Sequence, residues 1–262
     1  MITSSSNEKI KLVHALQTQR RARDKEALFV VEGLRLVEEV IRARAAVRLA
    51  LHTDTLDARG KSALNQLARL GAAVDVVSPA VMAEVSADQT PPGLLAVVSR
   101  SACCPLPAEL SFALALDGIG DPGNLGTMLR TADAAGVEAV FLAPGTVDAY
   151  NPKVIRAAMG AHFHVPLLPV SWEEMRARLG KLNVWLADVG QGQPYHQVDW
   201  RSPCALIVSS EAGGPSAEAS QFTTRRVQIP MSGRAESLNA AVAAGILMFE
   251  VARQRESPGL AS

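Results

Sequence analysis

The stretch "LALDGIGDPGNLGTMLRTADAAG", residues 114–136, contains the pattern G-x-G-x-x-G beginning at Gly118. It follows an apolar run and opens a helical pattern, which is where such glycines can form a dinucleotide-binding turn. A dinucleotide site also needs a carboxylate about 20 residues later, at the end of the next strand. The next apolar run ends instead in "APGT", residues 143–146, and Pro122 removes an N–H that a phosphate would need. These features argue against a nicotinamide-dependent oxidoreductase.

Polar side chains gather around this glycine-rich turn, at the end of an expected strand. Asp117, Asp121, Asn124 and Arg130 follow one another closely there. Ligands of open parallel α/β sheets bind at the carboxyl ends of the strands, so these side chains are candidates for a site. A simpler interpretation also fits, in which Asn124 caps a helix and Arg130 is a surface charge. The local pattern leaves both interpretations open.

The chain divides at a segment that two prolines interrupt. Apolar runs alternate with helical patterns up to residue 100, which predicts a small α/β domain over residues 26–100. Residues 1–25 are expected to form a basic N-terminal tail and helix. The prolines make residues 101–109 a linker. The alternation then resumes, which predicts a second α/β domain over residues 110–262.

The second domain is expected to contain a parallel sheet. Its apolar segments "FALALD", "EAVFLA", "NVWLAD" and "CALIVS" are separated by helical patterns. Strands that are buried on both faces have continuous apolar runs of this kind. The pattern therefore predicts an α/β fold in which helices cover both faces of a parallel sheet.

Charge is balanced over the whole chain but not locally. The 26 Lys and Arg residues equal the 26 Asp and Glu residues, so the net charge indicates no polyanionic partner. The segment "KIKLVHALQTQRRARDK", residues 9–25, holds six Lys and Arg against one acid. Such a cluster can neutralise RNA phosphates, and a solvated helix face is the alternative. The RNA-binding candidates are Arg20, Arg21, Arg23 and Lys25, together with Arg156 in the helical segment "NPKVIRAAMG".

The cysteines and histidines form no recognisable metal or disulfide pattern. The spacing suits neither a disulfide nor a metal site, because Cys103 and Cys104 are adjacent and Cys204 is distant. This cysteine usage is typical of a reduced, intracellular chain. The five histidines are scattered without acids or thiols at ligand spacing, so we expect no metal. The N-terminus lacks the apolar core of a signal peptide, and no apolar run reaches the roughly 18 residues of a membrane span. We therefore expect a soluble, cytoplasmic protein with no membrane partner.

Three segments, in this order, resemble the SpoU–TrmH family of RNA ribose 2′-O-methyltransferases. "DGIGDPGNLGTMLRTADAAG" is similar to the first motif of that family, "LIVSSEAGG" to a motif of the form G-x-E-x-x-G, and "IPMSGRAESLNAAVA" to the third. "YNPKVIRAAMGAHFHVP" is also similar to the family, and the resemblance covers most of residues 110–255. "RRARDKEALFVVEGLRLVEEV" resembles the ribosomal-protein-like RNA-binding domain that some members carry.

The resemblance implies a fold and an activity. The second domain would be tied in a trefoil knot and would bind S-adenosylmethionine, without a metal, to methylate a ribose 2′-hydroxyl of RNA. A homodimer would complete the site. The apolar final helix could be buried in the core or form a dimer contact, and the resemblance favours the dimer contact. The globular domain at the start of the chain favours ribosomal RNA as the substrate. The alternatives are a transfer-RNA ribose methyltransferase and a non-catalytic RNA-binding or ribosome-assembly protein on the same fold.

The resemblance also assigns roles to residues of the three motifs. It implies a catalytic role for Arg130, Asn124, Glu211, Ser237 and Asn239. It implies that the cofactor is bound by Ser209, Gly214, Ile229, Met231 and Leu238.

Physical chemistry limits some of these roles. A guanidinium is normally always protonated, so Arg130 is expected to pair with a phosphate and stabilise charge on the 2′ oxygen. Whether Arg130 also accepts the proton stays open. Ser237 is expected to cap the final helix, with Asn239 in its first turn. Ser209 stands where the family motif has glycine, and its Cβ would either narrow the cofactor pocket or be accommodated.

Overall fold

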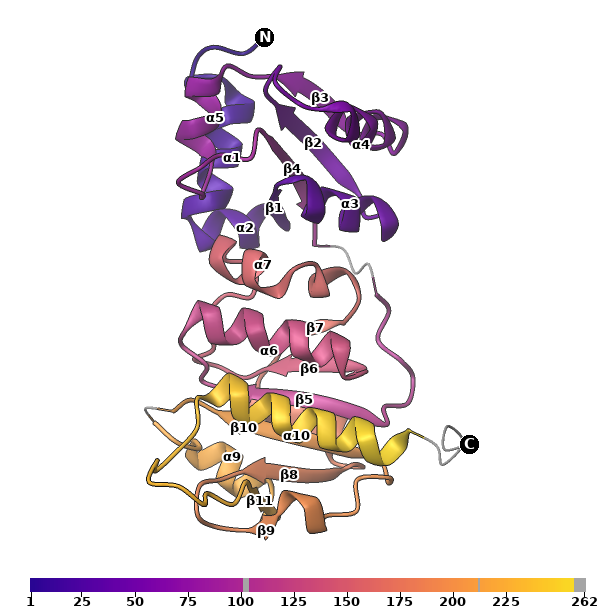
Figure 1. The fold of residues 1–262 in the computed structure, drawn as a ribbon, viewed down its shortest axis with the longest axis vertical. Coiled ribbons are helices and arrows are strands. Elements are labelled where there is room, and N and C mark those ends of the chain that lie inside the picture. The colour runs from indigo at the N-terminus through magenta and orange to yellow at the C-terminus, as the bar shows by residue number, and fades with distance from the viewer. Residues whose placement is uncertain (101–103, 212, 257–262) are drawn as a thin grey trace. The chain divides into compact units, whose positions relative to one another are not determined.

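The computed structural model describes residues 1–100, 104–211 and 213–256 (Figure 1). Residues 101–103 of the expected linker, which include Cys103, lie outside the described residues. The remainder of the linker, from Pro105 on, contains no helix or strand before residue 112.

Contacts divide the chain into two units. The first unit comprises Met1–Cys104 and Tyr150–His164, and the second comprises Pro105–Ala149 and Val165–Ser262. The segment Tyr150–His164 therefore packs with the first unit, although the proposed domain limits include it in the second domain. Hydrophobic periodicity identifies a helix in that segment, but it does not show which core the helix joins.

The first unit is built on a mixed four-stranded sheet in the order β1-β4-β2-β3. Strand β4 is antiparallel to β1 and to β2, and β2 is parallel to β3. In chain order the elements are α1 (Glu8–Thr18), α2 (Arg20–Glu26), β1 (Leu28–Glu32), α3 (Leu34–Arg42), β2 (Val47–His52), α4 (Ala58–Arg69), β3 (Ala73–Val76), α5 (Pro79–Val85), β4 (Leu94–Ser99), α7 (Pro152–Ala158) and the 3-10 helix η1 (Ala161–Phe163).

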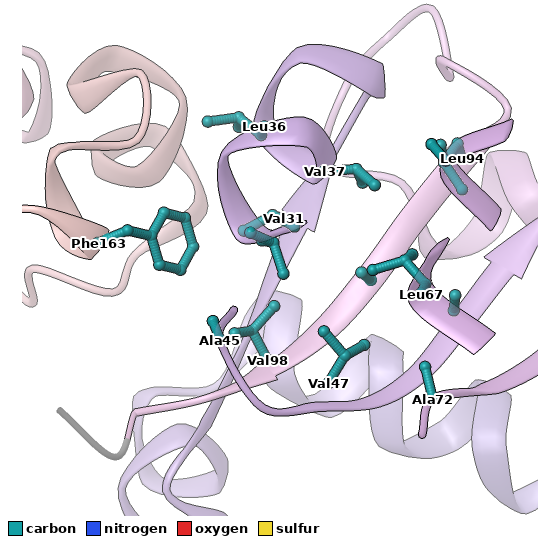
Figure 2. Close-up of a cluster of buried hydrophobic side chains, with 14 of the residues drawn as sticks. Val31, Leu36, Val37, Ala45, Val47, Leu67, Ala72, Leu94, Val98 and Phe163 are labelled. Atoms are coloured by element: carbon teal, nitrogen blue, oxygen red, sulfur yellow. The ribbon is translucent and has the colours of Figure 1, made fainter. Parts of the chain in front are cut away.

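Two apolar clusters fill the two faces of this sheet, because alternate residues of each strand point to opposite sides. Helices α3 and α4 cover one face, together with Phe163 of the segment Tyr150–His164 (Figure 2). Helices α1 and α5 contribute to the other cluster. Ile10, Val13 and Leu16 of α1 are at most 1% exposed. The basic N-terminal segment thus includes a helix that is part of the core.

The second unit contains a seven-stranded sheet in the order β7-β6-β5-β10-β8-β11-β9. Every neighbouring pair is parallel, which confirms the predicted parallel sheet. The elements are β5 (Phe112–Asp117), α6 (Pro122–Ala134), β6 (Ala139–Leu142), β7 (Leu167–Pro169), α8 (Trp172–Leu179), β8 (Asn183–Ala187), β9 (Gln193–Pro194), the 3-10 helix η2 (Tyr195–Gln197), β10 (Cys204–Ser209), α9 (Ala217–Phe222), β11 (Arg226–Gln228) and α10 (Ala240–Arg255).

Helices cover both faces of the parallel sheet. All six residues of β5, an interior strand, are buried. Met175 and Leu179 of α8 and Ala219 of α9 belong to the apolar cluster on one face. Helices α6 and α10 pack against each other and run across the sheet in Figure 1. This double cover explains the continuous apolar runs in the sequence of the strands.

A carboxylate holds the amino end of β5. Glu138 accepts hydrogen bonds from the N–H and the hydroxyl of Ser111, at 2.6 and 2.7 Å, and a longer one from the N–H of Phe112. Burial raises the pKa of Glu138, but these hydrogen bonds and the positive charge of Arg255 outweigh the effect of burial. The pKa of Glu138 therefore lies below its ordinary value.

We expect Glu138→Gln to lower stability at neutral pH. A carboxyl with a depressed folded-state pKa stabilises the fold above its ordinary pKa of 4.5 and loses that contribution as the pH falls through the folded-state pKa. The difference in urea midpoint between wild type and Glu138→Gln should thus shrink as the pH is lowered from about 7 to below about 4. A difference that stays constant over this range would contradict the assignment.

Candidate active site at the carboxyl edge of the parallel sheet

The carboxyl ends of β5 and β10 lie side by side. Ser209, the last residue of β10, pairs in register with Asp117, the last residue of β5. Asp117 is only 5% exposed, and the hydroxyl of Ser209 donates a hydrogen bond to its carboxylate at 2.9 Å. The turns that follow these two strands carry the first and second motifs. The parallel sheet therefore brings both motifs to one edge.

A cavity of about 230 Å³ opens at this edge. Its walls come from the ends of β8, β10 and β11 and from the segment that leads into α10. The five residues predicted to bind the cofactor all line it, namely Ser209, Gly214, Ile229, Met231 and Leu238. Two predicted catalytic residues, Glu211 and Ser237, line it as well.

Sequence reasoning missed other residues of the cavity wall, and one of them carried a usable signal. Asp188 directly follows the apolar run of β8, as Asp117 directly follows that of β5. Its carboxylate accepts a hydrogen bond from Arg226 at 2.9 Å and forms an ion pair with it. Ser210 is a second polar residue of the wall that sequence reasoning missed. The other missed residues have apolar side chains, which give no sequence signal for a ligand: Ala187, Val189, Val208, Pro215, Val227, Ala240, Ala243 and Leu247.

The second motif forms a tight turn. The N–H of Gly214 donates to the carbonyl oxygen of Ser210 at 3.1 Å. Gly214 has a φ of +63°, which favours glycine, and a Cβ there would meet no atom within 4 Å. Backbone conformation, not lack of space, therefore explains glycine at this position. Ser209, the departure from the family motif, lines the cavity, and its hydroxyl donates to the carboxylate of Asp117.

Glu211 joins segments that lie far apart in the sequence. Its Oε1 accepts hydrogen bonds from Nδ2 of Asn239 at 2.7 Å and from the N–H of Ala240 at 2.6 Å. A longer bond of 3.3 Å comes from Nδ2 of Asn124. Nδ2 of Asn239 also donates to Oδ1 of Asn124 at 3.0 Å. Three predicted catalytic residues thus form one hydrogen-bonded group, which we call the Glu211 network, at the border of the cavity.

Asn239, and not Ser237, caps the final helix. Oδ1 of Asn239 accepts hydrogen bonds from the N–H groups of Ala241 at 3.0 Å and Val242 at 3.3 Å, and α10 begins at Ala240. The prediction that Ser237 is the cap and Asn239 a first-turn residue is therefore wrong. Both residue types are good caps, so local preference does not distinguish starts two positions apart.

Helix α6 separates Asn124 from Arg130. Asp121 caps this helix by accepting a hydrogen bond from the N–H of Asn124 at 2.7 Å, so Asn124 is not the cap. The Asn124 side chain is thereby free to join the Glu211 network. Arg130, further along α6, is exposed and forms no hydrogen bond or ion pair with the residues that the structure describes. It does not line the cavity.

Arg23 is not available to bind RNA. Its residue surface is 3% exposed, and its Nη1 donates to the carbonyl oxygen of Leu16 at 2.7 Å. Arg23 thus ties α2 to α1, and its guanidinium lacks the exposure that the predicted RNA-binding role requires. The number of charges in a segment does not distinguish buried from exposed cations, and one side of α2 faces the core.

The other basic candidates are exposed. Arg20 lies 3.5 Å from Asp24, and Arg156 forms an ion pair with Asp88 at 2.9 Å. Arg21 and Lys25 of α2 have no such acidic partner among the described residues. Exposed ion pairs of this kind are weak, so all four side chains are able to turn towards a polyanion. The exposed candidates are Arg20, Arg21, Lys25 and Arg156.

No group of three His, Cys, Asp or Glu side chains in the described ranges is placed to hold a metal ion. No helix among them is both long and apolar enough to cross a membrane. Cys204 is a buried thiol, and burial raises its pKa to about 11.

The fold and the site define a class of protein, an α/β protein with a ligand cavity and a polar network at the carboxyl edge of a parallel sheet. Residues 111–249 match the model of the SpoU rRNA Methylase family. Residues 7–96 match the model of the MRM3-like substrate binding domain. The chain belongs to the SpoU rRNA methylase family.

Relatives and solved structures agree with this assignment. The chain is 37% identical to 23S rRNA (guanosine(2553)-2′-O)-methyltransferase RlmP of Bacillus subtilis, over 95% of this chain and 98% of that protein. An AdoMet-bound rRNA methyltransferase from Sinorhizobium meliloti matches with a TM-score of 0.85 at 29% identity, over 98% of both chains. The SpoU methyltransferase AviRb from Streptomyces viridochromogenes, in complex with AdoMet, matches with a TM-score of 0.83 at 28% identity, over 95% of this chain and 99% of that one.

These matches confirm the resemblance and the α/β fold class. They are consistent with a knotted second unit preceded by a separate N-terminal domain.

Proposed function

We propose that this chain transfers a methyl group from S-adenosylmethionine to a ribose 2′-hydroxyl of ribosomal RNA, in the cytoplasm. Its family and its similarity to a 23S rRNA 2′-O-methyltransferase over almost the whole chain support this activity. The observation that carries the proposal is the Glu211 network at the border of the cavity, because it combines a ligand site with polar groups able to hold a hydroxyl.

The cavity wall fits S-adenosylmethionine. Val227, Ile229, Met231, Leu238 and Leu247 provide an apolar surface for a flat adenine ring and a thioether chain. The polar groups of the donor require a few hydroxyl, carboxylate or backbone partners, which Ser209, Ser210, Asp188 and the turn at Gly214 offer. When bound there, S-adenosylmethionine supplies a methyl group that its positive sulfur has already activated.

The protein's own task is then to hold the ribose hydroxyl in line and to manage its proton. Oε1 of Glu211 is occupied by three N–H donors, whereas Oε2 accepts no hydrogen bond from the described residues. Asn239 uses its amide groups within the network and at the helix cap, so it positions Glu211 and Asn124. We assign Oε2 of Glu211 and the remaining N–H of Asn124 as the groups that hold the ribose.

Arg130 is assigned the role of a positive charge beside the reacting ribose. Its guanidinium is exposed and has no acidic partner among the described residues. Such a group pairs with an RNA phosphate and stabilises negative charge that develops on the 2′ oxygen. A phosphate bound at Arg130 would also fix the register of the ribose at the cavity.

Arg130→Ala is expected to reduce kcat for methyl transfer by at least about a hundredfold, because it removes a charge that acts in the transition state. The Kd for S-adenosylmethionine should change by less than about twofold, since Arg130 does not line the cavity. Arg178→Ala, which removes an exposed arginine from α8, is the matched control and should retain turnover. Near-normal kcat in Arg130→Ala would contradict the role.

The first unit is proposed to bind the RNA through its exposed cations. The match to a substrate-binding domain and the basic surface of α2 support this role. Each cation that neutralises a phosphate releases counterions, so its loss lowers the dependence of affinity on salt.

The double variant Arg21→Ala/Lys25→Ala is expected to weaken RNA binding, and to lower the slope of log K against log salt by about one for each cation. The matched control is Lys61→Ala/Arg69→Ala, which removes two exposed cations from α4 of the same unit. Filter-binding titrations at several salt concentrations measure both. Equal losses for the two pairs would show that charge acts without a preferred surface.

A homodimer is proposed to form through α10. Val242 and Phe249, seven residues apart on this helix, are each 51% exposed although the helix is otherwise largely buried. Residues seven apart share one helix face, and exposed apolar pairs of this size favour a protein contact. Because α6 packs against α10, a partner on this face would lie near the helix that carries Arg130.

Val242→Asp/Phe249→Asp is expected to convert the dimer to a monomer in light scattering after gel filtration, because charges at an apolar contact are costly to bury. Turnover should fall with the loss of the partner. Leu70→Asp, at an apolar residue of the first unit that is 40% exposed, is the control and should leave the mass unchanged. A wild-type protein that is monomeric would refute the dimer.

A further inference from the structure

Asp117 is a buried carboxylate with no role in the mechanism described above. It ends β5 at the edge where the cavity opens, and it is only 5% exposed. It forms no ion pair with the described residues, although buried carboxylates need compensating partners. Its compensation comes entirely from neutral hydrogen-bond donors.

One oxygen of Asp117 accepts two of these hydrogen bonds. The hydroxyl of Ser209 lies 2.9 Å from Oδ2, and the N–H of Ser216 lies 2.8 Å from the same atom. The backbone adds a third contact, from the N–H of Ser210 to the carbonyl oxygen of Asp117 at 3.2 Å. Bonds to a charged acceptor are about twice as strong as those between neutral groups.

The two donors stand at the two ends of one turn. Ser209 stands before the described residues 210, 211 and 213–215, and Ser216 stands after them, so the carboxylate binds this segment at both ends. The described residues between them include Glu211, which carries the network, and Gly214, which lines the cavity. A shift of this turn would move the cavity wall and the network together.

We propose that Asp117 is a positioning residue, which holds the turn 209–216 in the shape that binds S-adenosylmethionine and presents Glu211. The inference rests on the proposed function, because it takes the cavity as the donor site. Ser209 takes part in the same positioning, because Ser209, which replaces the family glycine, supplies one of the two hydrogen-bond donors to Asp117. Asp117 itself does not line the cavity, so it acts through the turn and not by contact with the donor.

The test compares Asp117 with a matched carboxylate at the opposite end of the same strand. Glu138 also accepts hydrogen bonds from a serine hydroxyl and backbone N–H groups, but it holds the amino end of β5, away from the cavity. Calorimetric titration with S-adenosylmethionine and thermal unfolding are measured for wild type, Asp117→Ala, Asp117→Asn and Glu138→Ala.

Asp117→Ala is expected to weaken donor binding about tenfold and to lower kcat, because both ends of the turn lose their acceptor. Asp117→Asn keeps one acceptor oxygen without the charge and should weaken binding about threefold. Glu138→Ala should lower Tm but leave the donor Kd within about twofold, since a general loss of stability does not reshape the cavity. If Asp117→Ala does not fold, the comparison of Asp117→Asn with wild type decides, and an unchanged Kd there overturns the proposal.

A double-mutant cycle tests the link to Ser209. Ser209→Gly removes the hydroxyl donor and should weaken donor binding in the wild-type background but have no further effect in Asp117→Ala, because the acceptor is already gone. Additive effects would overturn the coupling.

A separate variant tests whether the cavity is the donor site, independently of the positioning role of Asp117. Ile229→Trp fills the cavity and should abolish donor binding; if it does not, the cavity is not the donor site. Normal donor binding in Asp117→Ala together with lost binding in Ile229→Trp refutes only the positioning role.

Discussion

The site depends on the carboxylate of Glu211, whose Oε1 gathers N–H groups from α6 and from the start of α10. The macrodipole of α10 favours a negative charge at this position, and the bond to the N–H of Ala240 satisfies a donor that the helix itself cannot pair. The same contact that completes a helix end thus holds the amide side chains of Asn124 and Asn239 at the cavity. Under the proposed function, Glu211 therefore contributes both to helix stability and to the arrangement of the site.

The parallel sheet makes this contact possible. Strands that run in one direction place all their carboxyl ends at one edge, so the turns after β5 and β10 meet although 92 residues separate Asp117 from Ser209. Both strands are buried on both faces, so their ends hold the polar groups on well-packed elements rather than on loops alone. At this edge Asp117 accepts hydrogen bonds from Ser209 and Ser216, and Glu211, which lies between those two serines in the chain, accepts hydrogen bonds from Asn239.

Much of the fold and some of the site could be predicted from local pattern. Continuous apolar runs between helices predict a parallel sheet because the strands are buried on both faces, and the structure confirms it. Polar residues at the ends of such runs, such as Asp117, are site candidates because ligands of parallel sheets bind at the carboxyl ends of the strands. The motif resemblance selected five residues that all line one cavity. Local pattern failed where two residues had similar capping preferences, as for the choice between Ser237 and Asn239 as the cap of α10.

The sequence by itself determined the long apolar strands and the longer helices, the family, and the residue types that the chemistry needs. These follow from periodicity and motif spacing, which depend on neighbours along the chain. Only the tertiary structure decided that Arg23 is buried, that Tyr150–His164 packs with the first unit, and that Ser209 bonds to Asp117. Each of these outcomes depends on which segments pack together, and that packing is driven mainly by the burial of apolar surface. That free energy belongs to contacts between segments distant in sequence, and no local pattern contains it.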